Sequence, residues 1–134
     1  MIVLDTHTLG WWAAGDNRLS HTARDLITST IDHDIGQRVL FSAITTWEIA
    51  MLQQRERLVL SMDLDEWLHT VESMEGVEAV PLTPSVAIES TRLPGDFHKD
   101  PADRFIVALA RQLNVPLVTA DRKIRDYPHI RTVW

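Results

Sequence analysis

Short apolar runs alternate along the chain with longer segments in which apolar residues recur every three or four positions. A short apolar run is typical of a buried strand, and the longer spacing is typical of a helix that buries one face. The apolar runs predict strands over residues 2–4, 39–41, 77–82 and 116–119, with residues 130–134 as a fifth candidate. The helical spacing predicts helices over residues 8–14, 20–31, 42–54, 63–74, 85–91 and 101–113.

Residues that begin or end helices support these bounds. Gly15 follows the first helical segment, Ser42 precedes the third, and Thr83 is followed by a proline at the first helical position. Strands that alternate with helices predict an α/β fold with a mostly parallel central sheet of four to five strands flanked by helices. We expect a single domain over residues 1–134, with any ligand outside the carboxyl ends of the strands.

The composition fits one ordinary globular domain. The chain has 134 residues, of which 45% are hydrophobic and 24% charged. No apolar run reaches the ~18 residues of a membrane span, and Asp5 interrupts an apolar start that lacks the basic residues of a secretory signal. The absence of cysteine excludes disulfides, thiolate zinc sites and cysteine nucleophiles. We therefore expect a soluble, cytoplasmic protein that does not associate with membranes.

The charge is negative overall and unevenly distributed. The formal net charge is -6, which argues against a protein that binds nucleic acid through phosphate contacts alone. Residues 1–91 carry 5 Lys/Arg and 14 Asp/Glu, whereas residues 92–134 carry 8 and 5. A divalent cation together with this basic C-terminal part would allow an acidic protein to bind a polyanion.

Four acidic residues stand out because of where they fall among the predicted elements. Asp5 follows the first strand, and Asp121 follows the fourth. Glu48 lies in the second turn of the helix after the second strand, and Asp103 lies in the first turn of the helix over 101–113. Because the carboxyl ends of parallel strands meet at one edge of a sheet, we expect these four carboxylates to converge there.

Each acid also has a purely structural interpretation. Glu48 shares a helical stripe with Ile44 and Met51, where a carboxylate is costly unless it is paired, coordinated or neutralised, or reaches solvent from the rim. Asp5 and Asp121 could simply cap the helices that follow them.

The start of the helix over 101–113 separates two acids by role. Asp100 precedes Pro101, which favours an extended conformation at Asp100 and makes it the natural N-cap. Asp103 is then the third helical residue, whose side chain can lean beyond the helix end toward a cation. We therefore expect Asp103 to be the stronger metal candidate of the two.

A metal ion would explain why so many carboxylates converge. Two carboxylates ~4 Å apart repel by ~4 kcal/mol at an effective dielectric of about 20, so a cluster must hold either protons or a cation. All-oxygen sites suit Mg²⁺, with Mn²⁺ as an alternative. The six histidines show no metal-ligand spacing, and we expect them to be surface or packing residues. Magnesium held in this way suits activation of water at a phosphate.

Four segments resemble the PIN domain of VapC-type toxins. They are LDTHTLGWW at 4–12, SAITTWEIA at 42–50, HKDPADRFIVALA at 98–110 and LVTAD at 117–121. The resemblance covers essentially the whole chain, with the segments in order and at family-like spacings. It implies a PIN fold and a magnesium-dependent endoribonuclease that is the toxin of a toxin–antitoxin pair and is silenced by a VapB-like antitoxin protein.

The resemblance also implies roles for individual residues. Asp5, Glu48, Asp103 and Asp121 match the four family acids in order, and Asp100 belongs to the same Asp-Pro-x-Asp-Arg pattern. All five are therefore candidate metal ligands and catalytic residues. Arg104 fits the pattern as well, but the sequence assigns it no role.

Basic and aromatic residues suggest binding surfaces. We expect Arg122, Lys123 and Arg125 to hold RNA beside Asp121, the alternative being a solvated run of charge. Trp47 and Trp67 fit helical stripes and are predicted to lie in the core. The neighbouring Trp11 and Trp12 cannot both be buried on one narrow helix face, so one of them is a candidate anchor for a homodimer or for the antitoxin.

Two other functions remain open from the sequence. A phosphatase of the haloacid-dehalogenase type would use Asp5 as nucleophile, but His7 stands where that group has a second acid, and the chain has only two lysines as catalytic candidates. A non-catalytic interaction domain is the other alternative, and the intact set of four acids argues against it.

Overall fold

The computed structural model describes residues 1–32 and 36–134, so His33 lies outside the described residues. Its centre is a five-stranded sheet in the order β3-β2-β1-β4-β5, in which each neighbouring pair is parallel. The strands are β1 (Ile2–Leu4), β2 (Val39–Ser42), β3 (Val77–Val80), β4 (Leu117–Val118) and β5 (Thr132–Val133). This confirms the predicted α/β fold with a parallel sheet, although β3, β4 and β5 are shorter than the apolar runs that predicted them.

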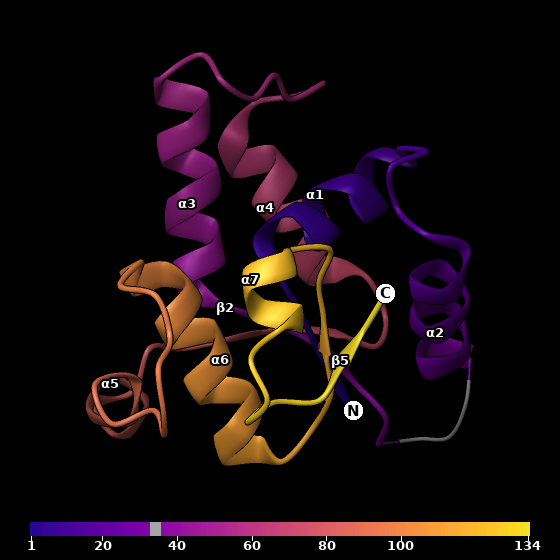
Figure 1. The fold of residues 1–134 in the computed structure, drawn as a ribbon. Coiled ribbons are helices and arrows are strands. Elements are labelled where there is room, and N and C mark those ends of the chain that lie inside the picture. Colours follow the sequence, from indigo (N-terminus) through magenta and orange to yellow (C-terminus); the bar gives the residue numbers. More distant parts are fainter. Residues whose placement is uncertain (33–35) are drawn as a thin grey trace.

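Helices connect the strands and cover the sheet (Figure 1). They are α1 (Thr6–Ala14), α2 (His21–Asp32), α3 (Ala43–Gln54), α4 (Leu64–Ser73), α5 (Pro84–Ser90), α6 (Pro101–Leu113) and α7 (Arg122–Arg125). None of the helices within the described ranges is long and apolar enough to cross a membrane.

Polar side chains fix where several helices begin. Ser42 accepts a hydrogen bond from the Ile44 backbone N–H and caps α3, as the sequence predicted. Helix α1 begins two residues earlier than predicted, because the Asp5 carboxylate accepts a hydrogen bond from the Thr6 N–H at 2.8 Å and so caps the helix itself. Asp5 therefore takes the structural role considered for it while also lying at the sheet edge.

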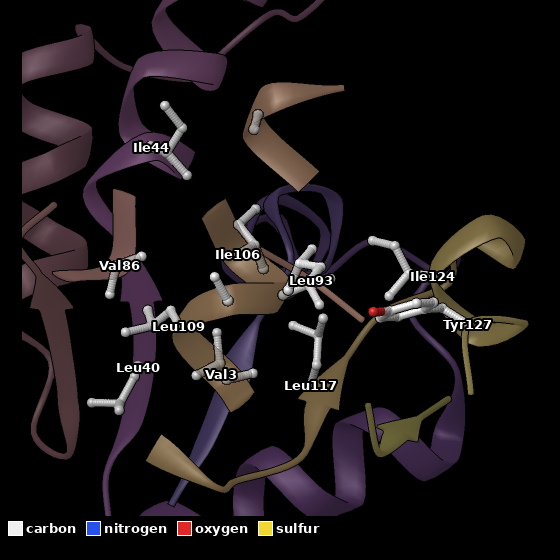
Figure 2. Close-up of a cluster of buried hydrophobic side chains, with 14 residues drawn as sticks. Val3, Leu40, Ile44, Val86, Leu93, Ile106, Leu109, Leu117, Ile124 and Tyr127 are labelled. Carbon is white, nitrogen blue, oxygen red and sulfur yellow. The ribbon is translucent and has the colours of Figure 1, made fainter. Parts of the chain in front are cut away.

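Two apolar clusters hold the helices against opposite faces of the sheet. Successive strand residues point to opposite faces, so Val3 belongs to one cluster and Ile2 and Leu4 to the other. Figure 2 shows the first cluster, in which Val3 and Leu117 of the sheet lie with Ile106 of α6. The second cluster includes residues of α1, α2, α3 and α4.

The two tryptophans predicted to lie in the core differ. Trp67 is buried, with 7% of its surface exposed, but Trp47 is 53% exposed, so that prediction is wrong. The buried residues of α3 are Ile44, Thr45 and Ile49. The buried face of α3 therefore includes a threonine. This face points away from Trp47, which lies on the exposed side of the helix.

Candidate metal and catalytic site

The five acidic residues singled out in the sequence line one pocket at the carboxyl edge of the sheet. The pocket has a volume of about 300 Å³ and is lined by Asp5, Thr6, His7, Glu48, His98, Asp100, Asp103, Asp121 and Lys123. The strands β1, β2 and β4 deliver Asp5, the start of α3 and Asp121 to this edge, and α6 begins beside them with Asp100 and Asp103.

Asp5 is the most enclosed of these carboxylates, with 4% of its surface exposed. One oxygen accepts the hydrogen bond from the Thr6 N–H, and the other accepts a hydrogen bond from the Thr119 hydroxyl at 2.7 Å. Burial raises the pKa of Asp5 above its ordinary value, whereas these two hydrogen bonds oppose the rise. Asp5 is thus fixed in orientation, with a charge that its surroundings compensate only in part.

Glu48 faces the pocket from the second turn of α3. The Thr6 hydroxyl donates a hydrogen bond of 2.5 Å to Glu48 Oε1 and also lies 3.2 Å from the Thr45 hydroxyl. Burial raises the pKa of Glu48, the nearby Asp5 and Asp100 charges raise it further, and the hydrogen bond from Thr6 lowers it. Thr6 therefore contributes its backbone N–H to Asp5 and its hydroxyl to Glu48.

Asp100 and Asp103 separate at the start of α6 in the manner the sequence predicts. Asp100 is the N-cap, and its carboxylate accepts a hydrogen bond from the Asp103 N–H at 3.1 Å, with Pro101 at the first helical position. The Asp103 side chain points into the pocket, where Oδ2 lies 3.0 Å from His98 Nε2.

The carboxyl group of Asp103 is strongly perturbed as well. Burial is the largest cause, and the charges of Asp5, Asp100, Asp121 and Glu48 add to it, so that the pKa of Asp103 is raised to about 8. The buried Nε2 of His98 has no well-aligned hydrogen-bond acceptor in the described structure despite its short distance to Asp103. This corner of the pocket therefore contains polar groups that the protein alone does not fully satisfy.

Asp121 caps the short helix α7, because its carboxylate accepts a hydrogen bond from the Lys123 N–H at 2.9 Å. Its own N–H donates to the hydroxyl oxygen of Thr119, the residue that donates to Asp5. Thr119 thus connects the two strand-end acids. Of the three basic residues expected to hold RNA, Lys123 lines the pocket, whereas Arg122 and Arg125 are exposed on α7 and do not line it.

Arg104 holds the loop that leads into α6. Its guanidinium donates to the carbonyl oxygens of Ser90 (2.8 Å), Phe97 (3.0 Å) and His98 (3.2 Å). It also lies over the Phe97 ring, which in turn packs 4.7 Å from the ring of Tyr127. The guanidinium therefore fixes the backbone that carries His98 and the capping Asp100.

The chemistry of the pocket fits a hydrated divalent cation. Its lining brings together five carboxylates, which repel one another, and the lining residues include one lysine, Lys123, and no arginine. No three acidic or histidine side chains within residues 1–32 and 36–134 are already gathered closely enough to hold an ion as a complete cage. Magnesium usually keeps several waters and is bound through one or two carboxylates, so a pocket of this kind suits it.

Several residues of the pocket were not singled out in the sequence. Thr6 and Thr119 orient the acids through their hydroxyls, and His7 and His98 line the pocket, although the histidines were expected to be surface or packing residues. The available signal was their position, since each lies within two residues of a candidate acid.

An apolar groove of about 540 Å³ lies beside the acid pocket. It shares Glu48 and Asp100 with that pocket, and its apolar part is formed by Ile44, Trp47, Met51, Leu52, Leu82 and Phe105. Trp47 and Leu82 are exposed here, at 53% and 42% of their surfaces.

Similarity to known proteins covers nearly the whole length of the chain. The family model for the PIN domain matches residues 2–130. Ribonuclease VapC22 of Mycobacterium tuberculosis is 38% identical over 135 residues, covering 99% of this chain and 98% of the relative.

Solved structures share the fold at lower identity. DNA-bound VapBC from Salmonella typhimurium has a TM-score of 0.67 at 21% identity, covering 98% of this chain and 96% of the other. VapC20 of M. tuberculosis, described as a toxin that cleaves the sarcin-ricin loop, has a TM-score of 0.62 at 16% identity, covering 98% and 99%. The match rules out the haloacid-dehalogenase alternative, and the chain belongs to the PIN domain family, among the VapC proteins.

Proposed function

We propose that this protein is a magnesium-dependent endoribonuclease and the toxin of a toxin–antitoxin pair. The observation that carries the proposal is the convergence of five carboxylates on one pocket, where burial and their mutual repulsion raise the pKa values of Asp5, Glu48 and Asp103. The 38% identical relative is named a ribonuclease, which supports RNA as the substrate.

Asp5, Glu48, Asp103 and Asp121 would hold the cation, with Asp100 in a secondary role because its carboxylate also caps α6. Magnesium, with Mn²⁺ as an alternative, would polarise the scissile phosphate and lower the pKa of a water that attacks the phosphorus. Thr119 and Thr6 keep Asp5 and Glu48 pointed into the pocket. Asp103 carries a proton near neutral pH in the metal-free protein and releases it when a cation binds.

The basic residues of α7 would hold the substrate. Lys123 lies in the lining of the acid pocket, where its ammonium can neutralise a phosphate next to the scissile bond. Arg122 and Arg125 are exposed on the same short helix and would contact neighbouring phosphates. Replacing all three with alanine should weaken RNA binding and flatten its salt dependence. An unchanged salt slope would instead identify α7 as a solvated charge run.

The test of the activity is cleavage of RNA by the purified protein. Total RNA should be cut in the presence of Mg²⁺, left intact with excess EDTA, and cut again when Mg²⁺ or Mn²⁺ is restored. The Asp5→Asn variant provides the matched control, because the amide keeps the size of the side chain and its oxygen can still accept one of the two hydrogen bonds that Asp5 accepts. Cleavage that persists in EDTA, or that Asp5→Asn retains in full, would overturn the proposal.

A VapB-like antitoxin is the proposed partner. Complexes of VapB with VapC are among the structures that share this fold, including VapBC2 of Rickettsia felis, with a TM-score of 0.65 at 15% identity over 99% of this chain. Expression of this chain alone should arrest growth, and the product of a neighbouring gene should relieve the arrest and bind the protein. A harmless protein with an intact pocket would contradict the toxin assignment.

The apolar groove beside the acid pocket is the surface we assign to a homodimer. An exposed tryptophan in such a groove is costly in water and is typical of the centre of a protein interface. Trp47→Ser should therefore shift the protein from dimer to monomer in sedimentation, and Val59→Ser, at a residue 90% exposed, should not. A wild-type monomer, or a Trp47→Ser dimer, would rule out this use of the groove.

A further inference from the structure

A chain of aromatic rings leads away from the acid pocket along α1. The His7 and Trp11 ring centroids are 5.7 Å apart, and those of Trp11 and Trp134 are 5.8 Å apart. The guanidinium of Arg18 lies 5.2 Å from the centre of the Trp11 ring and is held there by an ion pair of 2.7 Å with Asp16.

The fold explains why these rings meet next to the acids. Helix α1 begins at the carboxyl edge of the sheet directly after Asp5, so His7 lies at the pocket and Trp11 lies one helical turn beyond it. Strand β5 runs parallel to β4, and its carboxyl end brings the C-terminal Trp134 to the same edge. Figure 1 shows the C-terminus at the end of β5.

Of these three aromatic rings, His7 is the one that a ligand in the pocket can reach. It is exposed and lines the acid pocket, whereas Trp11 and Trp134 are partly buried and pack against the second apolar cluster. Trp11, which itself packs against Trp134, thus lies beside a ring that is open to the pocket.

We propose that His7, supported by Trp11 and Trp134, is a stacking site for an unpaired RNA base next to the scissile phosphate. Flat aromatic and imidazole rings bind splayed bases by stacking, and every base has a face for this contact. A phosphate held at the acid pocket carries its own nucleoside, and the ring nearest to that pocket on α1 is His7. The inference rests on the proposed ribonuclease function, since it is the phosphate in the pocket that places the base.

Substitutions at His7 separate stacking from charge and from packing. His7→Phe keeps a flat ring and removes the imidazole nitrogens, whereas His7→Ala removes both. Because His7 is exposed and absent from the apolar clusters, neither change should alter the fold, and equal melting temperatures will check this. His69→Ala, at an exposed histidine on α4 that does not line the acid pocket, is the matched control.

The first measurement is the affinity of each variant for a labelled, unstructured RNA of mixed sequence, with Ca²⁺ in place of Mg²⁺ and intact RNA verified afterwards. His7→Ala should weaken binding by about 5- to 150-fold, the range found when a base-stacking ring is removed. His7→Phe should stay within about threefold of the wild type, since its ring still stacks, and His69→Ala should not change the affinity. The same RNA annealed to its complement should not distinguish His7→Ala from the wild type.

The second measurement is cleavage in Mg²⁺ of RNAs that carry an abasic site at successive positions around the cleaved bond. For the wild type, an abasic site at one position next to the cleaved bond should lower kcat/KM. For His7→Ala, an abasic site at that same position should cause no further decrease. An equal loss of affinity in His7→Phe and His7→Ala, or no loss in either, would overturn the stacking site. Absence of any cleavage by the wild type would overturn the ribonuclease proposal instead, and the Ca²⁺ measurement would still decide whether His7 binds a base.

Discussion

The acid pocket has two parts, a strand side with Asp5 and Glu48 and an α6 side with Asp103. On the strand side, Asp5 and Glu48 accept hydrogen bonds from the hydroxyls of Thr119 and Thr6, which are buried. On the α6 side, Asp103 accepts no hydrogen bond from a hydroxyl or backbone N–H within the described part of the chain, and its nearest polar contact is His98 at 3.0 Å. Hydrogen bonds oppose the rise in pKa at Asp5 and Glu48, whereas every cause at Asp103 raises it, to about 8.

This difference indicates how the pocket would respond to a cation. The strand side is preorganised, because hydrogen bonds already orient its carboxylates and oppose part of the rise in their pKa values. The α6 side stays protonated near neutral pH until a cation compensates the negative charge. We therefore expect substitutions on the two sides to have different effects. These effects range from a near-complete loss of RNA cleavage to a modest change in the stability of the protein.

Asp103→Asn should cause the largest loss of cleavage. An amide oxygen cannot replace the anionic ligand, and since altering residues that only support metal ligands costs about 10- to 100-fold, loss of a ligand should exceed about 100-fold in kcat/KM. Asp100→Asn should lose much less, because asparagine is a good N-cap and Asp100 already uses its carboxylate to cap α6. If Asp100→Asn is inactive and Asp103→Asn is active, the two roles are reversed.

Thr119→Val should reduce activity by about 10- to 100-fold at limiting Mg²⁺, the usual cost of losing a group that orients a metal ligand. The valine removes the donor to Asp5 and the acceptor for the Asp121 N–H without changing the volume much. Thr119→Ser should restore most of the loss, since the hydroxyl is retained.

Thr8→Val is the control for Thr119→Val. It also removes a buried hydroxyl beside the site, but that hydroxyl donates to the Val118 carbonyl oxygen and not to a carboxylate. Its effect should be on stability, with an unchanged Mg²⁺ requirement. Similar Mg²⁺ profiles for Thr119→Val and Thr8→Val would show that the strand side is not preorganised by its hydroxyls.

The positions of the acidic residues could be predicted from the sequence, because they depend on helix caps, strand ends and neighbouring residues. Asp5, Asp100 and Asp121 each cap the helix that follows, and a parallel sheet brings the ends of its strands to one edge, so their convergence follows from element order alone. The Asp-Pro pair likewise separates Asp100 from Asp103 through backbone preferences that depend only on neighbouring residues.

The supporting contacts could not be predicted in this way, because they join residues far apart in sequence. Thr119 meets Asp5 across 114 positions, and Thr6 meets Glu48 across 42. Trp47 was misplaced for a related reason, since the buried arc of α3 includes Thr45, whose hydroxyl lies against that of Thr6. A pattern of apolar residues gives no indication that a threonine is buried.

Arg104→Lys should weaken the α6 side by a smaller amount. A single ammonium cannot bridge the three carbonyl oxygens that the planar guanidinium joins, so the loop carrying His98 should loosen and activity should fall by about 3- to 10-fold. Arg131→Lys is the control, because Arg131 donates to the Asn114 carbonyl at the far end of α6. Equal losses in the two variants would show that Arg104 does not act through the loop.

The smallest effect concerns the stability of the metal-free protein between about pH 4 and pH 8. In the unfolded chain Asp103 loses its proton near its ordinary pKa of 3.8, whereas in the folded protein it keeps the proton up to about pH 8. The folded state therefore binds more protons across this interval, and stability must fall as the pH rises. In EDTA, the melting temperature should decrease from pH 5 to pH 8, and Asp103→Asn should remove much of that decrease, whereas Asp65→Asn, at an exposed acid on α4, should leave it unchanged. Added Mg²⁺ should raise the melting temperature more at pH 8 than at pH 5, since the ion no longer has to displace the proton. If metal-free stability does not depend on pH, or if Asp103→Asn keeps the full slope, then Asp103 is already ionised without a metal and the two sides of the pocket do not differ in the way described.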